Sequence, residues 1–181
     1  MKHLIVVVGL PGSGKDTQID LLQKLRKIEV IRIGDLIRER AKTNPLIAQA
    51  LHAGNLVDYD LVNAIVQQQF ESFPDGSIIV SDGFPRDTDQ ADWMESYASA
   101  HGIEISKYIL LEISDQESLA RLLRRGREDD TQATIQRRIE VFHELTDEVI
   151  DNARGRDNFT TVDATGSTDE IFKRVKAALG W

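Results

Sequence analysis

A glycine-rich segment near the start of the chain has the residue types and spacing needed to bind phosphate. It runs from Gly9 to Gln18 with the sequence GLPGSGKDTQ, after the apolar run Leu4 to Val8 and before an amphipathic stretch. Glycine lacks a Cβ, so this backbone can take positive φ and turn its N–H groups toward an anion. Lys15 adds a mobile positive charge, and the helix that begins here adds the positive end of its dipole. We therefore predict a phosphate-binding loop rather than a glycine-rich turn without a ligand.

The residues after that lysine differ from the usual pattern. A loop of this type places Ser or Thr directly after the Lys to contact Mg²⁺, whereas here Asp16 stands in that place and Thr17 follows it. An acidic residue in the first turn of a helix is ordinary, because it complements the helix dipole. A carboxylate beside a triphosphate should instead repel it, unless Mg²⁺ or its water shell lies between them. The sequence leaves both interpretations of Asp16 open.

Another acidic residue follows the third apolar run of the chain. Asp82 comes directly after Ser77 to Ser81, at a strand end where a carboxylate can hold Mg²⁺ or its water. An Asp in this place can also be only a helix cap or a turn former. Because a phosphate loop is present elsewhere in the chain, we favour the metal interpretation. We predict that Asp82 and Thr17 contact Mg²⁺ through water.

Six arginines lie between Arg121 and Arg138, although the chain is acidic overall. Arg121 and Arg125 are four residues apart, so they share one helix face and can present two guanidinium groups to one nucleotide. In that arrangement Arg121 would stack on a base and Arg125 would hold phosphate. A solvated helix end is the alternative, since the dipole favours cations there. Asp129 and Asp130 would either pair with the arginines or cap the next helix.

Composition limits the kinds of partner that this chain can have. Its 181 residues are 41% hydrophobic and 29% charged, which fits one compact domain. A net charge of −8 argues against a general nucleic-acid or membrane-surface binder. There is no Cys, and the four His residues lie far apart, so we expect neither disulfides nor zinc. The first apolar run is too short for a signal peptide or a membrane span, and we expect a cytoplasmic protein.

Hydrophobic periodicity predicts an alternation of strands and helices. The predicted strands are Leu4 to Val8, Val30 to Ile33, Ser77 to Ser81, Tyr108 to Ile113 and Phe159 to Val162. The predicted helices are Gly14 to Lys27, Gly34 to Lys42, Leu46 to Ala53, Tyr59 to Ser72, Thr88 to His101, Gln116 to Arg125, Thr131 to Ala153 and Thr168 to Leu179. This alternation indicates an α/β fold, a parallel sheet covered by helices on both faces. Ligands of such sheets bind at the carboxyl ends of the strands.

Several motifs together resemble those of the adenylate kinases and other nucleoside monophosphate kinases. The loop of that family reads G-x-P-G-S-G-K-G-T-Q, so that only Asp16 is unusual here. The DGFPR string with Gln90 four residues after its arginine also matches closely, as do R-x-x-x-R-G and G-R-x-D-D in the arginine-rich segment. The resemblance covers nearly the whole chain with its motifs in the family's order. It implies a single P-loop NTPase-type, doubly wound domain over 1–181, with a five-stranded parallel sheet. It also implies a small helical monophosphate-binding insertion at about 34–63 and a minimal lid at about 125–130.

The resemblance also implies roles for individual residues in the transfer of a phosphoryl group from ATP to AMP with Mg²⁺. The ATP-binding residues would be Gly12, Ser13, Gly14, Lys15, Asp16, Thr17, Arg121, Arg125 and Gly166, with Ser167 next to the last. The AMP-binding residues would be Ile33, Gly34, Arg38, Leu56, Val57, Gly83, Arg86, Gln90, Arg127 and Arg138. The residues acting on the transferred group would be Lys15, Arg86, Arg125, Arg127 and Arg138.

Two features set this chain apart from the family pattern. Adenylate kinases place a Thr before the GD dipeptide of the second motif, where this chain has Ile33, and the lost hydroxyl bears on the choice of acceptor base. Arg125, Gly126 and Arg127 are consecutive, whereas even short-lid members separate these arginines by several residues. With so small a lid, the exclusion of water depends on side chains. We expect fast nucleotide release and wasteful ATP hydrolysis.

Two other classes of function remain as alternatives to adenylate kinase activity. One is a kinase for another monophosphate, such as UMP or CMP, or for a small molecule of the shikimate type on the same scaffold. The other is a nucleotide-binding protein with little catalysis, which Asp16 and the short lid suggest. A signalling GTPase is disfavoured, because the chain has no N-K-x-D motif. No heptad pattern or long apolar edge indicates an oligomer, so we expect a monomer.

Overall fold

A single parallel sheet forms the centre of the protein. The computed structural model describes residues 1–127 and 130–181. Its strands are β1 (Lys2–Val8), β2 (Glu29–Arg32), β3 (Ile78–Asp82), β4 (Ile103–Glu112) and β5 (Phe159–Asp163). They lie in the order β2-β3-β1-β4-β5, and every neighbouring pair is parallel. The predicted α/β fold with a five-stranded parallel sheet is confirmed.

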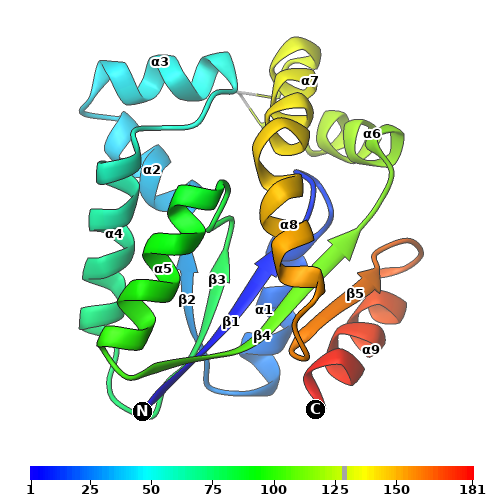
Figure 1. Cartoon of the computed structure of the whole chain (residues 1–181). Coiled ribbons are helices and arrows are strands. Elements are labelled where there is room, and N and C mark those ends of the chain that lie inside the picture. Colours follow the sequence, from blue (N-terminus) through cyan, green and yellow to red (C-terminus); the bar gives the residue numbers. More distant parts are fainter. Residues whose placement is uncertain (128–129) are drawn as a thin grey trace.

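Strand β1 is buried on both faces because its side chains alternate between two hydrophobic clusters. Leu4, Val6 and Val8 belong to one cluster, and Ile5 and Val7 belong to the other. The first cluster is covered by α4 (Tyr59–Ser72), α5 (Thr88–Ala100) and α8 (Asp147–Arg154), and the second by α1 (Lys15–Leu25) and α9 (Thr168–Leu179) (Figure 1). In the parts of the chain that the structure describes, no helix combines the length and the apolar character needed to cross a membrane.

Two helical pairs extend past the carboxyl ends of the strands (Figure 1). One consists of α2 (Ile33–Ala41) and α3 (Pro45–Ala53), which lead into α4. The side chain of Asn44 caps α3, and Gly54, with φ 74°, ends it in the left-handed conformation. The other pair is α6 (Asp115–Arg125) and α7 (Gln132–Val141). These two pairs place polar side chains on opposite sides of the strand ends.

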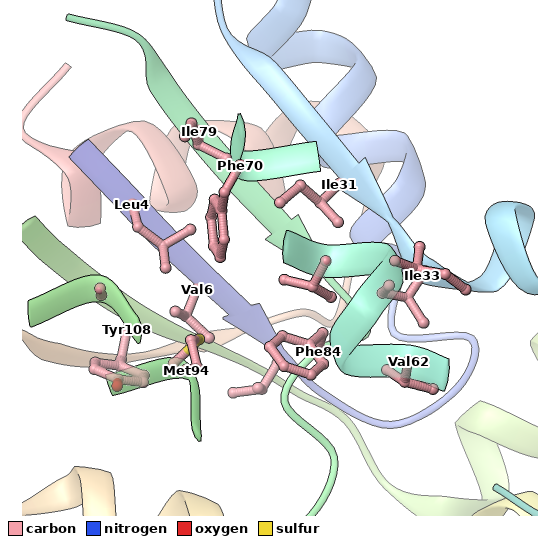
Figure 2. Close-up of a cluster of buried hydrophobic side chains, with 14 of the residues drawn as sticks. Leu4, Val6, Ile31, Ile33, Val62, Phe70, Ile79, Phe84, Met94 and Tyr108 are labelled. Carbon is pink, nitrogen blue, oxygen red and sulfur yellow. The ribbon is translucent and has the colours of Figure 1, made fainter. Parts of the chain in front are cut away.

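The core fixes the loop that follows β3. Phe84 of this loop is fully buried, and Figure 2 shows it within the same cluster of side chains as Val62 of α4 and Val6 of β1. The Oγ of Ser81 donates a hydrogen bond to the carbonyl oxygen of Phe84 at 2.5 Å. Burial of one phenylalanine side chain is worth about 1.5–3 kcal/mol, so the loop is held firmly at the strand end.

Three element boundaries differ from those expected from the sequence. Ile33 begins helix α2 instead of ending the second strand. Strand β4 begins at Ile103, earlier than predicted, because this polar first half still pairs with β1 from Lys2 to Leu4. The helix predicted over 131–153 is interrupted by a π-helical turn, η1 (Phe142–Thr146), between α7 and α8. Such turns leave no signal in hydrophobic periodicity.

Candidate active site

A cavity of about 530 Å³ opens at the carboxyl ends of β1 and β3. Its wall combines the glycine-rich loop after β1, the loop after β3, the segment 33–72 from α2 to α4, here called the α2–α4 arm, and the α6–α7 pair. Val7 of β1 is in register with Asp82 of β3, so the two loops leave the sheet side by side. This is the edge of a parallel sheet at which ligands are expected to bind.

The glycine-rich loop fits its surroundings only because two residues lack a side chain. Gly9 has φ 151° and Gly12 has φ 82°, values that favour glycine. A Cβ at Gly9 would lie 2.5 Å from the carbonyl oxygen of Leu111, and one at Gly12 would lie 2.9 Å from Cγ of Leu122. The loop therefore packs directly on β4 and α6, which leaves its other side toward the cavity.

Lys15 folds back across this loop. Its Nζ donates hydrogen bonds to the carbonyl oxygens of Gly9 at 2.8 Å and Leu10 at 3.2 Å. Burial is the main reason why the pKa of Lys15 is lowered, while the nearby carboxylates act in the opposite direction. Ser13, which was predicted to bind ATP, is fully buried and is not among the residues that line the cavity.

Two carboxyl groups meet beside Lys15. Burial first, and then a hydrogen bond with Asp16, raise the pKa of Asp82 to about 7. The same hydrogen bond is the largest cause that lowers the pKa of Asp16. Asp82 is only 6% exposed yet lines the cavity, as does Thr17. Carboxylate and hydroxyl oxygens are the ligands that Mg²⁺ prefers, so Asp82 and Thr17 are suited to contact its water shell, whereas the described residues contain no cluster of three or more acidic, His or Cys side chains that could hold the ion directly.

Three hydrogen bonds hold Arg86 in place. Its backbone N–H donates to Oε1 of Gln90 at 2.9 Å, and its Nε donates to the carbonyl oxygen of Gly83 at 2.9 Å. Its carbonyl oxygen accepts a hydrogen bond from Oγ1 of Thr146 at 2.7 Å. Burial is the main cause of the lowered pKa of this guanidinium. Arg86 lines the cavity, and none of these three contacts uses its terminal nitrogens.

Asp130 gathers three of the predicted arginines. Its side chain is fully buried and accepts hydrogen bonds from Nε and Nη2 of Arg125, both at 2.9 Å. It also accepts from Nη1 of Arg138 at 3.0 Å and from the backbone N–H of Arg127 at 3.2 Å. Burial alone would raise the pKa of Asp130, but the hydrogen bonds and charges of Arg125 outweigh it and the pKa is lowered. Thr131, and not Asp130, caps α7.

Arg121 lies at the other end of the cavity, next to the loop after β5. Its Nε donates to Oε1 of Glu117 at 2.7 Å, and its Nη2 donates to the carbonyl oxygen of Ala164 at 2.9 Å. Gly166 of the same loop also lines the cavity and has φ 97°. These hydrogen bonds fix the plane of the Arg121 guanidinium next to the loop after β5.

Residues 7–157 match the family model described as adenylate kinase. The chain belongs to the adenylate kinase family. It is 36% identical to an adenylate kinase of Synechococcus sp. (strain WH7803) over 99% of this chain and 100% of that protein. It is 34% identical to the adenylate kinase of Mycolicibacterium smegmatis, with 97% and 98% covered, and 31% identical to that of Thermus thermophilus, with 97% and 96% covered. The family expected from the motifs is confirmed.

On the side of the α2–α4 arm, apolar side chains line the cavity beside Arg38. Ile33 is 1% exposed and lines the cavity together with Leu56 and Val57. Nη2 of Arg38 lies 2.5 Å from Oδ1 of Asp35, so this arginine forms an ion pair with the acid three positions before it on α2. A Cβ at Gly34 would approach Nη2 of Arg38 to 3.1 Å, and the glycine gives that guanidinium room over the cavity.

The fold brings nearly all of the predicted site residues to one cavity. Those that line it are Gly12, Gly14, Lys15, Asp16, Thr17, Ile33, Gly34, Arg38, Leu56, Val57, Asp82, Gly83, Arg86, Gln90, Arg121, Arg125, Arg127, Arg138 and Gly166. Asp129 lies outside the described residues. Their individual roles remain predictions. Sequence reasoning missed Thr146, which lines the cavity and holds Arg86, because it lies inside a segment predicted as one continuous helix.

Proposed function

We propose that the protein is an ATP:AMP phosphotransferase, forming two ADP from ATP and AMP. The observation that carries this proposal is the convergence of Lys15 and five arginines on one cavity between the glycine loop and the α2–α4 arm. The arginines are Arg38, Arg86, Arg125, Arg127 and Arg138. Phosphoryl transfer requires alignment and charge neutralisation more than covalent catalysis, and such a set of fixed cations supplies both.

The two ends of the cavity suggest how the substrates would lie. The loop amides and Lys15 would hold the phosphates of ATP, whose base would lie by Arg121 and Gly166. Arg38 and Arg86 would hold the phosphate of AMP on the opposite side. Arg125, Arg127 and Arg138 line the same cavity and would stabilise the charge that develops on the transferred phosphoryl group.

Asp130 would act on this chemistry by fixing the arginines. Its bidentate pairing holds the Arg125 guanidinium in one plane, and the further bond to Arg138 ties α7 to the end of α6. Arginines held in this way lose little freedom when the nucleotide arrives. The preorganised charge therefore supports the transition state without a reorganisation cost.

We propose that Mg²⁺ accompanies ATP, with Asp82 and Thr17 as the residues that hold its water shell. The ion would neutralise the phosphate charge. This can be tested without turnover by measuring Mn²⁺ binding in the presence of ATP. The broadening of the electron paramagnetic resonance signal of Mn²⁺ reports its binding. Asp82→Asn should weaken Mn²⁺ binding in the presence of ATP by about tenfold or more. Unchanged binding would remove Asp82 from the metal site.

Recognition of the acceptor base follows from the orientation of Gln90. Oε1 of Gln90 is occupied by the backbone N–H of Arg86, and its Nε2 bonds to no described residue. Gln90 therefore offers a donor to the base. Ring nitrogens of adenine accept such a bond, but guanine also has acceptors, so Gln90 alone does not separate the two. With Ile33 in place of a hydroxyl residue, a kinase for another monophosphate remains the second candidate.

The test is a coupled assay of ADP formation from ATP with AMP, GMP, CMP, UMP and dTMP in turn. AMP should give the highest kcat/KM. A higher value for another monophosphate would establish the second candidate. If the protein binds ATP but forms no ADP with any acceptor, it is a binding protein instead. A crystal with two adenosines joined by five phosphoryl groups should place both bases and all five arginines as described.

We also propose that the enzyme is a monomer, while the cytoplasmic location stays a prediction. The exposed large apolar side chains in the described parts of the chain, such as Leu25, Leu46 and Leu123, lie on different helices instead of forming one patch. Analytical ultracentrifugation should give a mass near 20.4 kDa. A concentration-dependent dimer would overturn this proposal.

A further inference from the structure

Five of the cations that line the cavity differ in what holds them. Lys15 is bonded to the loop carbonyls, and Arg86 is bonded through Nε to Gly83. The guanidinium groups of Arg125 and Arg138 are bonded to Asp130. Arg127 is tied to Asp130 only through its backbone N–H. Among the described residues, the single partner of the Arg127 guanidinium is Asp16, with Nη2 3.5 Å from Oδ2.

We propose that Asp16 is a positioning residue that holds the Arg127 guanidinium over the phosphate loop. This inference rests on the proposed phosphoryl transfer and assigns Asp16 a part in it. Asp16 lies in the first turn of α1, directly after Lys15, whereas Arg127 lies between α6 and α7. The ion pair thus joins two segments that are separated by 111 positions in the sequence, across the mouth of the site that each of them lines.

Electrostatics explains why Arg127 needs such a partner. Lys15 and Arg125 lie within electrostatic reach of the same Asp16 carboxylate as Arg127, so like charges gather in this part of the cavity and repel. The Arg127 side chain is 35% exposed, so without a counter-charge it would gain solvation by turning outward. The Asp16 carboxylate lies close enough to Lys15, Arg127 and Arg125 to interact with all three. It therefore keeps Arg127 at the phosphate loop before the nucleotide binds.

This arrangement also accounts for a carboxylate beside a triphosphate site. The repulsion that Asp16 exerts on the phosphates is offset by the guanidinium that it retains, because Arg127 is then in place when ATP arrives. Asp130, the acid of this segment that the structure describes, binds the guanidinium groups of Arg125 and Arg138 and only the backbone N–H of Arg127, so the Arg127 guanidinium needs another anchor. An acid on α1 supplies one from the opposite wall.

A double-mutant cycle separates this proposal from an independent effect of Asp16. Asp16→Asn removes the charge with little change of shape, and Arg127→Ala removes the partner. We expect Asp16→Asn alone to lower kcat about threefold to fivefold, the effect of one partly exposed ion pair, while KM for AMP stays unchanged. In the Arg127→Ala background the same substitution should cause no loss, or a small gain from reduced repulsion.

Two further variants complete the cycle. Asp16→Glu keeps the charge and should recover most of kcat. Asp169→Asn removes an acid from the same second position of a helix, α9, where the structure describes no ion pair for Asp169, and should leave kcat unchanged. This control measures the loss of one charge and of its interaction with a helix dipole, without loss of Arg127 positioning.

The proposal is overturned if Asp16→Asn lowers kcat equally in both backgrounds, or if it raises kcat with Arg127 intact. The first result would mean that Asp16 acts without Arg127, and the second that repulsion of ATP dominates. The same double-mutant cycle can be carried out without turnover, by measuring the ATP dissociation constant of each variant by calorimetry. If the protein transferred no phosphoryl group, a threefold to fivefold coupling between the two residues in ATP affinity would still support the ion pair, and additive effects would reject it.

Discussion

Thr146 and Arg86 are 60 positions apart in the sequence, yet Oγ1 of Thr146 donates a 2.7 Å hydrogen bond to the carbonyl oxygen of Arg86. Thr146 is 4% exposed and ends the π-helical turn between α7 and α8. Interruptions of this kind are frequent at functional sites. The bond couples the helix that carries Arg138 to the loop that carries Arg86. Two arginines from distant segments are thus held relative to each other by one hydroxyl group.

Removing the hydroxyl group of Thr146 should weaken the binding of AMP more than the binding of ATP. Thr146→Val keeps the shape but leaves the Arg86 carbonyl without its partner, at a cost of about 1–3 kcal/mol in the free energy of unfolding. We expect KM for AMP to rise several-fold with KM for ATP unchanged, because the loop of Arg86 loses one of three anchors. Steady-state kinetics and urea unfolding measure both effects. Thr146→Ser should restore AMP binding, and an equal rise in both KM values would contradict this account.

Lys15→Ala and Arg86→Ala should each nearly abolish turnover. Each removes one preorganised charge from the phosphate site, and such losses commonly lower the rate by about 10² to 10³. Circular dichroism should show an intact fold, since neither side chain belongs to the hydrophobic clusters. Wild-type activity in either variant would refute the assigned site.

Asp130 should be as important as the arginines that it binds. Asp130→Asn keeps the size of the side chain but removes its negative charge and replaces one acceptor oxygen with an NH₂ donor, so that it can no longer pair bidentately with Arg125 while also accepting from Arg138. Both guanidinium groups lose their fixed plane, so we expect kcat to fall by about 10² while KM for AMP changes little. The control is Glu39→Gln, which removes an exposed carboxylate paired with Lys42 and should leave kcat unchanged. Normal kcat in Asp130→Asn would mean that the arginines orient themselves.

The sequence predicts those parts of the fold and the site that depend on local patterns, and not those that depend on contacts between distant segments. The run LIVVV predicts a doubly buried strand, because burial on both faces requires only local composition. The glycine spacing likewise predicts the phosphate loop, because the conformation of that loop depends on the local sequence. The pairs Asp16–Arg127 and Thr146–Arg86 depend on which segments the sheet brings together, and no local pattern encodes them. The convergence of the arginines was expected only because the motifs resembled those of a known family.

Boundaries were missed where a local preference was overruled by tertiary contacts. Ile33 has a high preference for strands, yet it begins α2, because the strand has no partner beyond the pairing of Arg32 with Asp82. Glu104, Ser106 and Lys107 break the apolar pattern of β4, but Glu104 and Lys107 still pair with β1, and Ser106 lies at the register shift between them. In both places the pairing of strands, and not the pattern of side chains, determines where the element begins or ends.

His143 should make the stability of the protein depend on pH. Its Nδ1 lies 2.8 Å from Oδ2 of Asp147, and its Nε2 lies 2.9 Å from Oδ1 of Asp115 at the start of α6. The hydrogen bond to Asp147, followed by that to Asp115, raises the pKa of His143 above the ordinary value of 6.5. A raised pKa in the folded state gives stability that is fully present below pH 6.5 and is lost as pH rises through the raised pKa.

Urea unfolding of the wild type and His143→Gln from pH 5.5 to 8.5 measures this contribution. The difference between the two proteins should be largest at pH 5.5 and shrink toward pH 8.5. Because the side chain is 43% exposed, solvent screening should limit it to less than about 1 kcal/mol. A difference that does not change with pH would mean that His143 contributes by packing alone.

Hydrolysis of ATP in the absence of AMP should be measurable in this enzyme. Only six positions separate the end of α6 at Arg125 from the start of α7 at Gln132, which leaves little chain to cover the phosphates. Water excluded only by side chains reaches the γ-phosphate more readily than water excluded by a closing flap. Phosphate release from ATP alone should exceed that of Lys15→Ala, which serves as the control for contaminating ATPases. A rate no higher than this control, beside rapid transfer to AMP, would show that the arginines themselves exclude water well enough.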